Sequence, residues 1–270
     1  MRKTKIDYSA RTHVGCVRGN NEDNLYTDGV SLPLGARELP FSIDGCVAVP
    51  AIFAVCDGMG GEDDGEVASQ IVVQALAAIE LLLKSSAVTD LPHIVQATVE
   101  RANTEIRELG GTEKRIGTTL ALVVARSNGV HCASIGDSRI YCLRRGTFWQ
   151  VTRDHTLAAE RQNQDVHMKS AHMLTRCIGI GSAATVAHYA QIRGACRLLI
   201  CSDGLTDMVE STAIEYVLRT TPRASAAADR LISAALSNGG RDNITVIVLD
   251  IGPPKLSLQG LIKQKKRKEK

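Results

Sequence analysis

The stretch Ala51-Ile-Phe-Ala-Val-Cys-Asp-Gly-Met-Gly-Gly61 decides how the rest of the chain is interpreted. Its first six residues are apolar, which is typical of a buried β-strand when turn-forming residues flank the run. Asp57 follows this strand directly, and the glycines after it allow the backbone to approach a ligand without a Cβ in the way. The stretch therefore predicts a rigid strand with a carboxylate at its end.

The same pattern recurs at three further strands. Asp137 follows the run 133–136, Asp203 follows the run 198–202, and Asp242 directly precedes the run 243–249. A single strand-end aspartate is more often a turn or cap residue than a ligand, but packed sheets can bring several strand ends into one cleft. Bare carboxylates gathered there would raise one another's pKa unless a cation neutralised them. Oxygen-only ligands favour Mg²⁺ or Mn²⁺ over Zn²⁺ or Cu²⁺.

A fifth segment, Val17-Arg-Gly-Asn-Asn-Glu-Asp23, places a cation beside two acids. The planar guanidinium of Arg18 is suited to gripping two oxygens of a phosphate, while Glu22 and Asp23 can hold metal-bound waters. The alternative for Arg18 is a surface ion pair with Glu22, worth less than about 1 kcal/mol.

Hydrophobic patterning indicates an α+β protein in which strands and helices are segregated into layers. Capping chemistry at Asp90-Leu-Pro92 and at Thr221-Pro222 predicts two helix starts. The expected strands are 46–56, 118–125, 130–135, 139–143, 147–151, 197–201 and 244–251, and the expected helices are 65–84, 91–109, 206–219 and 223–237.

Composition sets outer limits on the class of protein. With 270 residues, of which 44% are hydrophobic and 23% charged, the chain has ordinary globular composition and predicts one domain over residues 1–254. Polar residues interrupt the longest apolar stretch, 67–83, so no membrane span is expected, and the N-terminus lacks the apolar region of a signal peptide. The eight cysteines contain no CxxC pair, which favours reduced thiols in a cytoplasmic protein.

The C-terminal segment 255–270 carries the basic character of the chain. It holds seven of the 32 Lys and Arg residues and one of the 29 Asp and Glu residues, so the net charge of +3 becomes −3 for residues 1–254. No aromatic residue interleaves this segment to stack on bases, so we expect a solvated, disordered tail and no nucleic-acid partner.

Taken in order along the chain, these motifs resemble the metal-dependent type 2C protein serine/threonine phosphatases in their compact bacterial form. The resemblance covers roughly residues 5 to 250, and the matching segments are 17–23, 55–61, 117–119, 136–139, 152–156, 174–176, 202–205 and 241–245. It implies a central β-sandwich flanked by helices on both outer faces, in four α-β-β-α layers, with a metal centre at one end.

The resemblance also implies roles for individual residues. Asp57 would bridge two Mg²⁺ or Mn²⁺ ions, with Asp203 and Asp242 completing one ion and the Gly58 carbonyl and Glu22 serving the other. Asp137 matches the position that holds a third, weaker ion, Asp23 would orient a metal-bound water, and Arg18 matches the phosphate-binding arginine. The implied reaction is hydrolysis of phosphoserine and phosphothreonine in proteins by a metal-activated water without a phosphoenzyme, opposing a serine/threonine kinase, in a monomer.

Two other functions remain open: a phosphatase dedicated to one regulatory protein, such as an anti-sigma-factor antagonist, and a phosphatase-like binding protein without turnover. The chain departs from the family pattern at Met59, where many eukaryotic members carry a histidine that can protonate the leaving group. The connection 28–50 is longer than usual, and the expected flap, 157–173, is shorter. Both departures bear on substrate choice.

Three further patterns are expected to be decoys. Asn243-Ile-Thr245 matches a glycosylation sequon, but the chain lacks a signal peptide. His167 and His172 are expected to be solvated flap residues. Ser202, Asp203 and His155 have the composition of a hydrolase triad, but the Gly-x-Ser-x-Gly elbow is missing.

Overall fold

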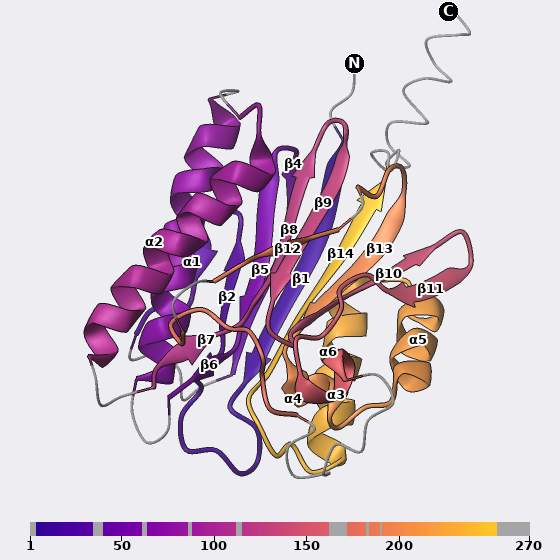
Figure 1. Cartoon of the computed structure of the whole chain (residues 1–270). Coiled ribbons are helices and arrows are strands. Elements are labelled where there is room, and N and C mark those ends of the chain that lie inside the picture. The colour runs from indigo at the N-terminus through magenta and orange to yellow at the C-terminus, as the bar shows by residue number, and fades with distance from the viewer. Residues whose placement is uncertain are drawn as a thin grey trace, which may run out of the picture.

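The computed structural model describes residues 4–34, 40–60, 64–85, 88–111, 115–161, 172–181, 184–189 and 191–252. Two six-stranded antiparallel sheets pack face to face, and helices cover both outer faces (Figure 1). The α+β sandwich with α-β-β-α layering that the sequence predicts is therefore confirmed. The predicted tail, 255–270, lies outside the described residues.

The first sheet, sheet A, consists in spatial order of β11 (Thr147–Gln150), β10 (Arg139–Arg144), β13 (Cys196–Cys201), β14 (Ile244–Gly252), β1 (Lys5–His13) and β4 (Phe41–Ala48). The second, sheet B, consists of β12 (Ala187–His188), β9 (Gly129–Ile135), β8 (Leu120–Arg126), β5 (Ala51–Cys56), β2 (Asn24–Thr27) and β3 (Val30–Ser31). A two-stranded ribbon, β6 (Gly58–Met59) with β7 (Gly117–Thr118), extends from sheet B.

Each outer face has its own set of helices. Sheet B is covered by α1 (Gly65–Lys84) and α2 (Leu91–Gly110), and sheet A by α4 (Asp203–Thr206), α5 (Ser211–Thr220) and α6 (Ala224–Ser237). A short helix, α3 (Leu157–Glu160), follows β11 in the chain.

The central strands are apolar on both faces because both faces are covered. In β5, Ile52 and Ala54 pack in the cluster under α1 and α2, whereas Phe53 and Val55 pack in the cluster between the sheets. The two-residue period of a strand sends alternate side chains to these two cores. A continuous apolar run such as Ala51–Cys56 is therefore the sequence of a strand in the middle of a four-layer fold.

Helix α1 has the bounds that the sequence predicts, and it is the one described helix long and apolar enough to cross a membrane. Within the fold, 56% of its most apolar 18-residue window is buried. Its buried Glu80 accepts a hydrogen bond from Tyr26 and pairs with Lys84 at 2.7 Å. These contacts are those of a helix packed on a sheet.

The strand expected over 46–56 is wrong, because two strands in different sheets occupy that range. β4 ends at Ala48 in sheet A, and β5 begins at Ala51 in sheet B. The chain changes sheet at Val49-Pro50, where proline lacks the N–H needed to continue a ladder. Because the residues on both sides of this crossing are apolar, the hydrophobic pattern alone does not reveal it.

The helix expected over 206–219 is also wrong. The chain forms α4 and then α5, with an extended Glu210 at the N-cap of α5. The helix start predicted at Thr221-Pro222 falls instead on Arg223, the N-cap of α6. The carbonyls of Thr221 and Pro222 accept hydrogen bonds from Arg197 at 2.5 and 2.7 Å, which fixes this connection to sheet A.

Other local predictions are confirmed. The Asp90 side chain accepts a hydrogen bond from the His93 amide at 3.1 Å and caps α2. Six of the eight cysteines are buried, as expected of small core residues. Strand β1 was not among the predicted strands. Its residues alternate between polar and apolar, and it is held by pairing with both β14 and β4.

Candidate metal centre and active site

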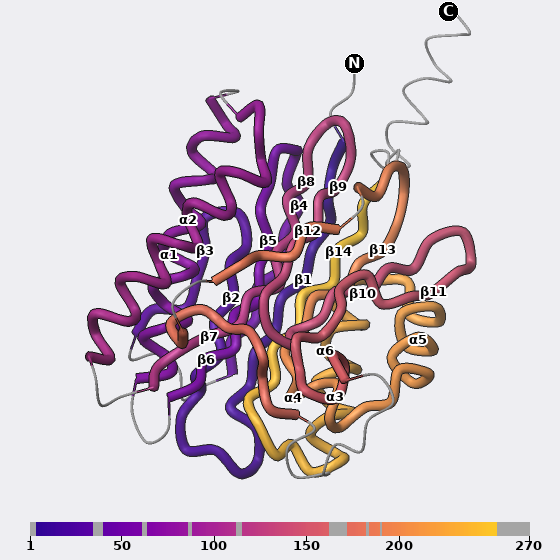
Figure 2. The backbone as a smooth tube through the Cα atoms, in the orientation of Figure 1, coloured from indigo at the N-terminus to yellow at the C-terminus, as the bar shows by residue number. Residues whose placement is uncertain are grey.

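A cleft of about 390 Å³ lies at one end of the sandwich. Seven of the eight predicted site residues line it: Arg18, Glu22, Asp57, Gly58, Asp137, Asp203 and Asp242. The eighth, Asp23, is almost completely buried, with 1% of its surface exposed. Figure 2 shows the indigo connection between β1 and β2 at the same end of the molecule as the segment that leads into β14. Residues from both ends of the chain thus meet at this cleft.

The end of β5 is held by threonines of the segment 117–119. The amide of Asp57 donates to the Thr119 hydroxyl at 3.0 Å, and the carbonyl of Asp57 accepts from the Thr118 hydroxyl at 2.9 Å. Thr119 also shares a hydrogen bond of 2.7 Å with Ser138, next to Asp137. Thr118 and Thr119 thus connect the two strand ends that carry Asp57 and Asp137.

Two glycines permit close backbone approaches around the carboxylates. A Cβ at Gly58 would overlap the carbonyl oxygens of Gly65 and Glu22, and a Cβ at Gly204 would overlap the carbonyl oxygen of Asn243. The glycines after Asp57 and Asp203 are therefore required by packing at the cleft.

Asn243 fixes the segment that carries Arg18 and Glu22. Its amide nitrogen donates to the carbonyls of Val14 and Asn20, both at 2.9 Å, and its amide oxygen accepts from the Glu22 backbone at 2.8 Å. The side chain is buried, which agrees with the expectation that the sequon is a decoy. This positioning role was not predicted from the sequence, where its one signal is the place of Asn243 directly after Asp242.

Asp23 lies behind the cleft wall, where it accepts a hydrogen bond of 2.7 Å from Ser202. Burial, with smaller contributions from Asp203 and Asp242, raises its pKa to about 7, against the lowering effect of hydrogen bonds from Thr245 and Ser202. A group poised in this way can hold or release a proton near neutral pH.

Burial is also the main cause of raised pKa values among the carboxyl groups that line the cleft. The pKa of Asp57 is raised well above its ordinary value by burial and by repulsion from Asp23, Asp203 and Asp137. Burial and the neighbouring Asp203 raise the pKa of Asp137 to about 8. Burial also raises the pKa of Asp203 to about 6, with Asp207 and Asp242 adding to the shift. These neighbours would all ionise readily if a cation shared the cleft.

The donor set fits a hard cation that keeps part of its hydration. The cleft offers carboxylate oxygens and the Gly58 backbone, and among the described residues that line it there is no cysteine thiol and no buried imidazole. Among the residues with described positions, no three Asp, Glu, His or Cys side chains converge closely enough to hold an ion on their own. Mg²⁺ is typically bound through one or two carboxylates while water completes its coordination, and this arrangement suits such an ion.

Arg18 pairs with Asp242 at 2.8 Å, whereas the surface alternative had paired it with Glu22. This hydrogen bond is the main reason that the pKa of Arg18 is raised. The side chains are 54% and 41% exposed, and exposed pairs contribute at most about 1 kcal/mol. The guanidinium can therefore exchange this partner for a phosphate at small cost.

The described ends of the expected flap, 157–173, meet beside the cleft. Thr156 and Leu174 form a β-bridge, and the Leu157 amide donates to the Met173 carbonyl at 3.0 Å. Residues 162–171, including His167, lie outside the described residues. His172 is exposed as expected, but it also lines the cleft, together with Met59.

The hydrolase triad is excluded by the hydrogen bonds of its members. Ser202 is fully buried, donates to Asp23, and accepts from the Thr245 amide at 3.0 Å. His155 accepts from the Gly136 amide through Nδ1 at 3.0 Å. Both groups therefore support the loops around the cleft and present no nucleophile.

Known proteins resemble this chain in sequence and in fold. Residues 43–238 match the protein phosphatase 2C family. The serine/threonine protein phosphatase PstP of Mycobacterium tuberculosis is 34% identical over 256 residues, which cover 91% of this chain and 45% of that protein. The serine/threonine phosphatase stp of Listeria monocytogenes is 30% identical over 89% of this chain and 94% of its own length.

A solved structure, the catalytic domain of PstP in complex with two manganese ions, is 33% identical, with a TM-score of 0.74 over 92% of this chain and 99% of that domain. The two-sheet sandwich is thus shared with a solved phosphatase domain. The chain belongs to the protein phosphatase 2C family, a family of serine/threonine protein phosphatases. It spans about half the length of the PstP proteins and nearly all of the Listeria relative.

Proposed function

We propose that this protein hydrolyses phosphoserine and phosphothreonine in proteins, using two Mg²⁺ or Mn²⁺ ions and a third, weaker one. The observation that carries the proposal is the convergence of Asp57, Asp203 and Asp242 with Arg18 in one cleft. When bound, these ions supply charge that neutralises phosphoryl oxygens and acidifies a water for in-line attack. The solved PstP domain with two manganese ions supports the choice of cation.

The roles of individual residues extend this proposal. Asp57 would be shared by two ions, with Asp203 and Asp242 serving one, and Glu22 and the Gly58 carbonyl serving the other. Asp137 would hold the third ion. These positions are supported by their places on the cleft wall and by burial that disfavours unneutralised charge.

Arg18 and Asp23 would act on the substrate and on a proton, respectively. Arg18 stands at the cleft with an exposed guanidinium, where two oxygens of a phosphate can replace Asp242. Asp23 is held by Ser202 behind the cleft and is suited to orienting a water and accepting its proton.

The cellular context that we propose is a monomeric cytoplasmic enzyme with one catalytic domain over residues 1–254, acting against a serine/threonine kinase. It is supported by the bacterial relatives, which are named serine/threonine phosphatases.

The deciding experiment measures hydrolysis of p-nitrophenyl phosphate and of a phosphothreonine peptide with Mn²⁺, with EDTA, and in Asp57→Asn. We expect turnover that requires the ion and is abolished in the variant, because the substitution removes a shared carboxylate. Activity that survives both EDTA and the substitution would overturn the mechanism. Metal binding without turnover on any phosphopeptide would favour the binding protein, and turnover of one phosphoprotein alone would favour the dedicated phosphatase.

A further inference from the structure

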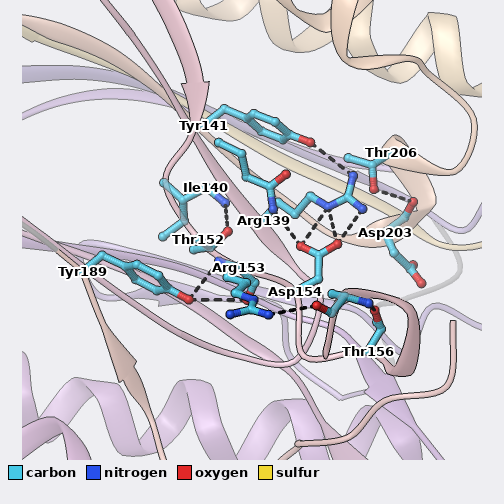
Figure 3. A network of polar contacts seen from close by, with 12 residues as sticks. Arg139, Ile140, Tyr141, Thr152, Arg153, Asp154, Thr156, Tyr189, Asp203 and Thr206 are labelled. Atoms are coloured by element: carbon cyan, nitrogen blue, oxygen red, sulfur yellow. Dashed lines mark hydrogen bonds and ion pairs between the residues drawn. The ribbon is translucent and has the colours of Figure 1, made fainter. Parts of the chain in front are cut away.

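A half-buried ion pair between Arg139 and Asp154 lies near Asp203, which lines the cleft (Figure 3). The guanidinium donates to the carboxylate through Nε at 2.9 and 3.1 Å and through Nη2 at 2.6 Å. Its Nη1 donates to the Tyr141 hydroxyl at 3.2 Å. The two charged side chains are 26% and 15% exposed, so solvent ions screen this pair less than they screen a fully exposed one.

The position of Arg139 in the sheet brings its charge close to two proposed metal ligands. Arg139 pairs with Cys201 at the end of the β10–β13 ladder. Asp137 lies two residues before Arg139, in the connection that leads into β10, and Asp203 lies two residues after Cys201, at the start of α4. The guanidinium attracts both carboxylates electrostatically. The positive charge of Arg139 therefore lies near the place where metal cations are expected to bind.

This placement creates a competition that Asp154 can resolve. A guanidinium forms strong bidentate bonds with any carboxylate in reach, and a carboxylate occupied in this way is a poorer ligand for a metal. Asp154 occupies the Nε and Nη2 donors, and Asp154 is itself held by Gln150, whose amide donates to it at 2.7 Å. Arg139 therefore contributes its field at the cleft while its directional bonds are engaged elsewhere.

We propose that Asp154 is a positioning residue that keeps Arg139 from bonding Asp137 or Asp203, so that these carboxylates remain open to metal ions. The inference rests on the proposed function, since it takes both aspartates to be metal ligands. Asp154 acts through Arg139 in this role, which needs no contact between Asp154 and the substrate. It also explains how Arg139 can lie beside an acidic cleft without occupying the carboxylates of that cleft.

The test is titration of the metal-free protein with Mn²⁺, following free Mn²⁺ by electron paramagnetic resonance, in wild type and in Asp154→Asn. Loss of the partner charge should release the guanidinium toward Asp203 or Asp137. We expect the dissociation constant of at least one ion to rise about 10- to 100-fold, the usual range when a residue supporting a metal ligand is lost. An unchanged dissociation constant for every ion would overturn the proposal.

A double variant separates this role from general damage to the fold. In Asp154→Asn with Arg139→Gln, no released cation remains, so Mn²⁺ affinity should return to within about threefold of wild type. If Asp154 merely supports the local fold, the second substitution will not restore affinity. Failure of this rescue therefore contradicts the proposal.

Sheet A offers a matched control at its opposite end. Arg197 and Asp250 form a bidentate pair at 2.7 Å with side chains that are 11% and 20% exposed. Asp250→Asn should lower thermal stability and leave Mn²⁺ affinity unchanged, because neither Arg197 nor Asp250 lines the cleft. A similar loss of affinity in this control would attribute the effect to the fold.

The proposed function is tested separately by Asp57→Asn in the same titration. If wild type binds no Mn²⁺ that depends on Asp57, the proposed function fails. If Asp57-dependent binding is present and Asp154→Asn is silent, the inference about Asp154 alone is wrong.

Discussion

Replacing Asn243 by alanine should loosen the segment 14–22 and damage the cleft from a distance. The substitution removes three hydrogen bonds, to Val14, Asn20 and the Glu22 amide, at 2.8 to 2.9 Å. At a net contribution of about 0.5 to 1.5 kcal/mol each, their loss lowers the free energy of unfolding by about 2 to 4 kcal/mol. For a domain of this size, 1 kcal/mol shifts Tm by about 2 to 4 °C, so we expect a decrease of roughly 5 to 15 °C.

The same variant should bind phosphate more weakly, because Arg18 lies in the loosened segment. A loss of about 1.4 kcal/mol in binding raises KM about tenfold. The assay combines thermal denaturation with KM for a phosphothreonine peptide. Asn103→Ala is the matched control: Asn103 is 3% exposed and accepts from the Gly179 amide at 2.8 Å, and neither residue lines the cleft. The control should lose stability and keep KM, and an unchanged KM in Asn243→Ala would refute the reasoning.

Three other predictions concern single positions. Arg18→Lys should raise KM for phosphorylated substrates although the charge is kept, because an ammonium cannot grip two oxygens in one plane; steady-state kinetics with an unchanged KM would assign Arg18 to a structural role. Met59→His should increase turnover more on phosphoserine peptides than on p-nitrophenyl phosphate, because a serine alkoxide depends more on protonation as it leaves; equal effects would show that protonation is not limiting. Asp28→Asn should stabilise the protein at pH 7 to 8. Burial and Glu80 raise the pKa of Asp28 to about 6 in the folded protein. The wild-type protein therefore loses free energy of unfolding as the pH rises from about 4 through 6 and Asp28 ionises, and the variant does not. Urea denaturation across that range measures this, and a variant that keeps the wild-type pH slope between 4 and 6 would contradict it.

The local signals in this sequence were sufficient wherever neighbours along the chain decide the structure. Helix α1 begins and ends where its pattern predicts, and Asp90 caps α2 through its own side chain. The aspartates at strand ends were identifiable because an apolar run that stops at an acid marks a boundary between core and solvent. Placing those ends in one cleft required the family resemblance, since the pairing of strands is not visible in a local pattern.

The predictions failed where distant residues choose between local alternatives. The crossing at Val49-Pro50 looks like the middle of one strand, and only pairing with β1 on one side and β8 on the other separates β4 from β5. The polar residues of β1 hid it, although Arg11 within it pairs with Asp44 and Asp229 from distant parts of the chain.

The sequence by itself thus determined which residues could carry the chemistry: acids where buried strands end, glycines beside them, and an arginine suited to phosphate. Only the tertiary structure decided how these residues are held, with Asn243 bound to a segment 221 residues away and Arg139 turned toward Asp154 beside Asp203. The physical reason is that composition and periodicity act between near neighbours, whereas hydrogen bonds and ion pairs form between whichever groups the strand register brings together.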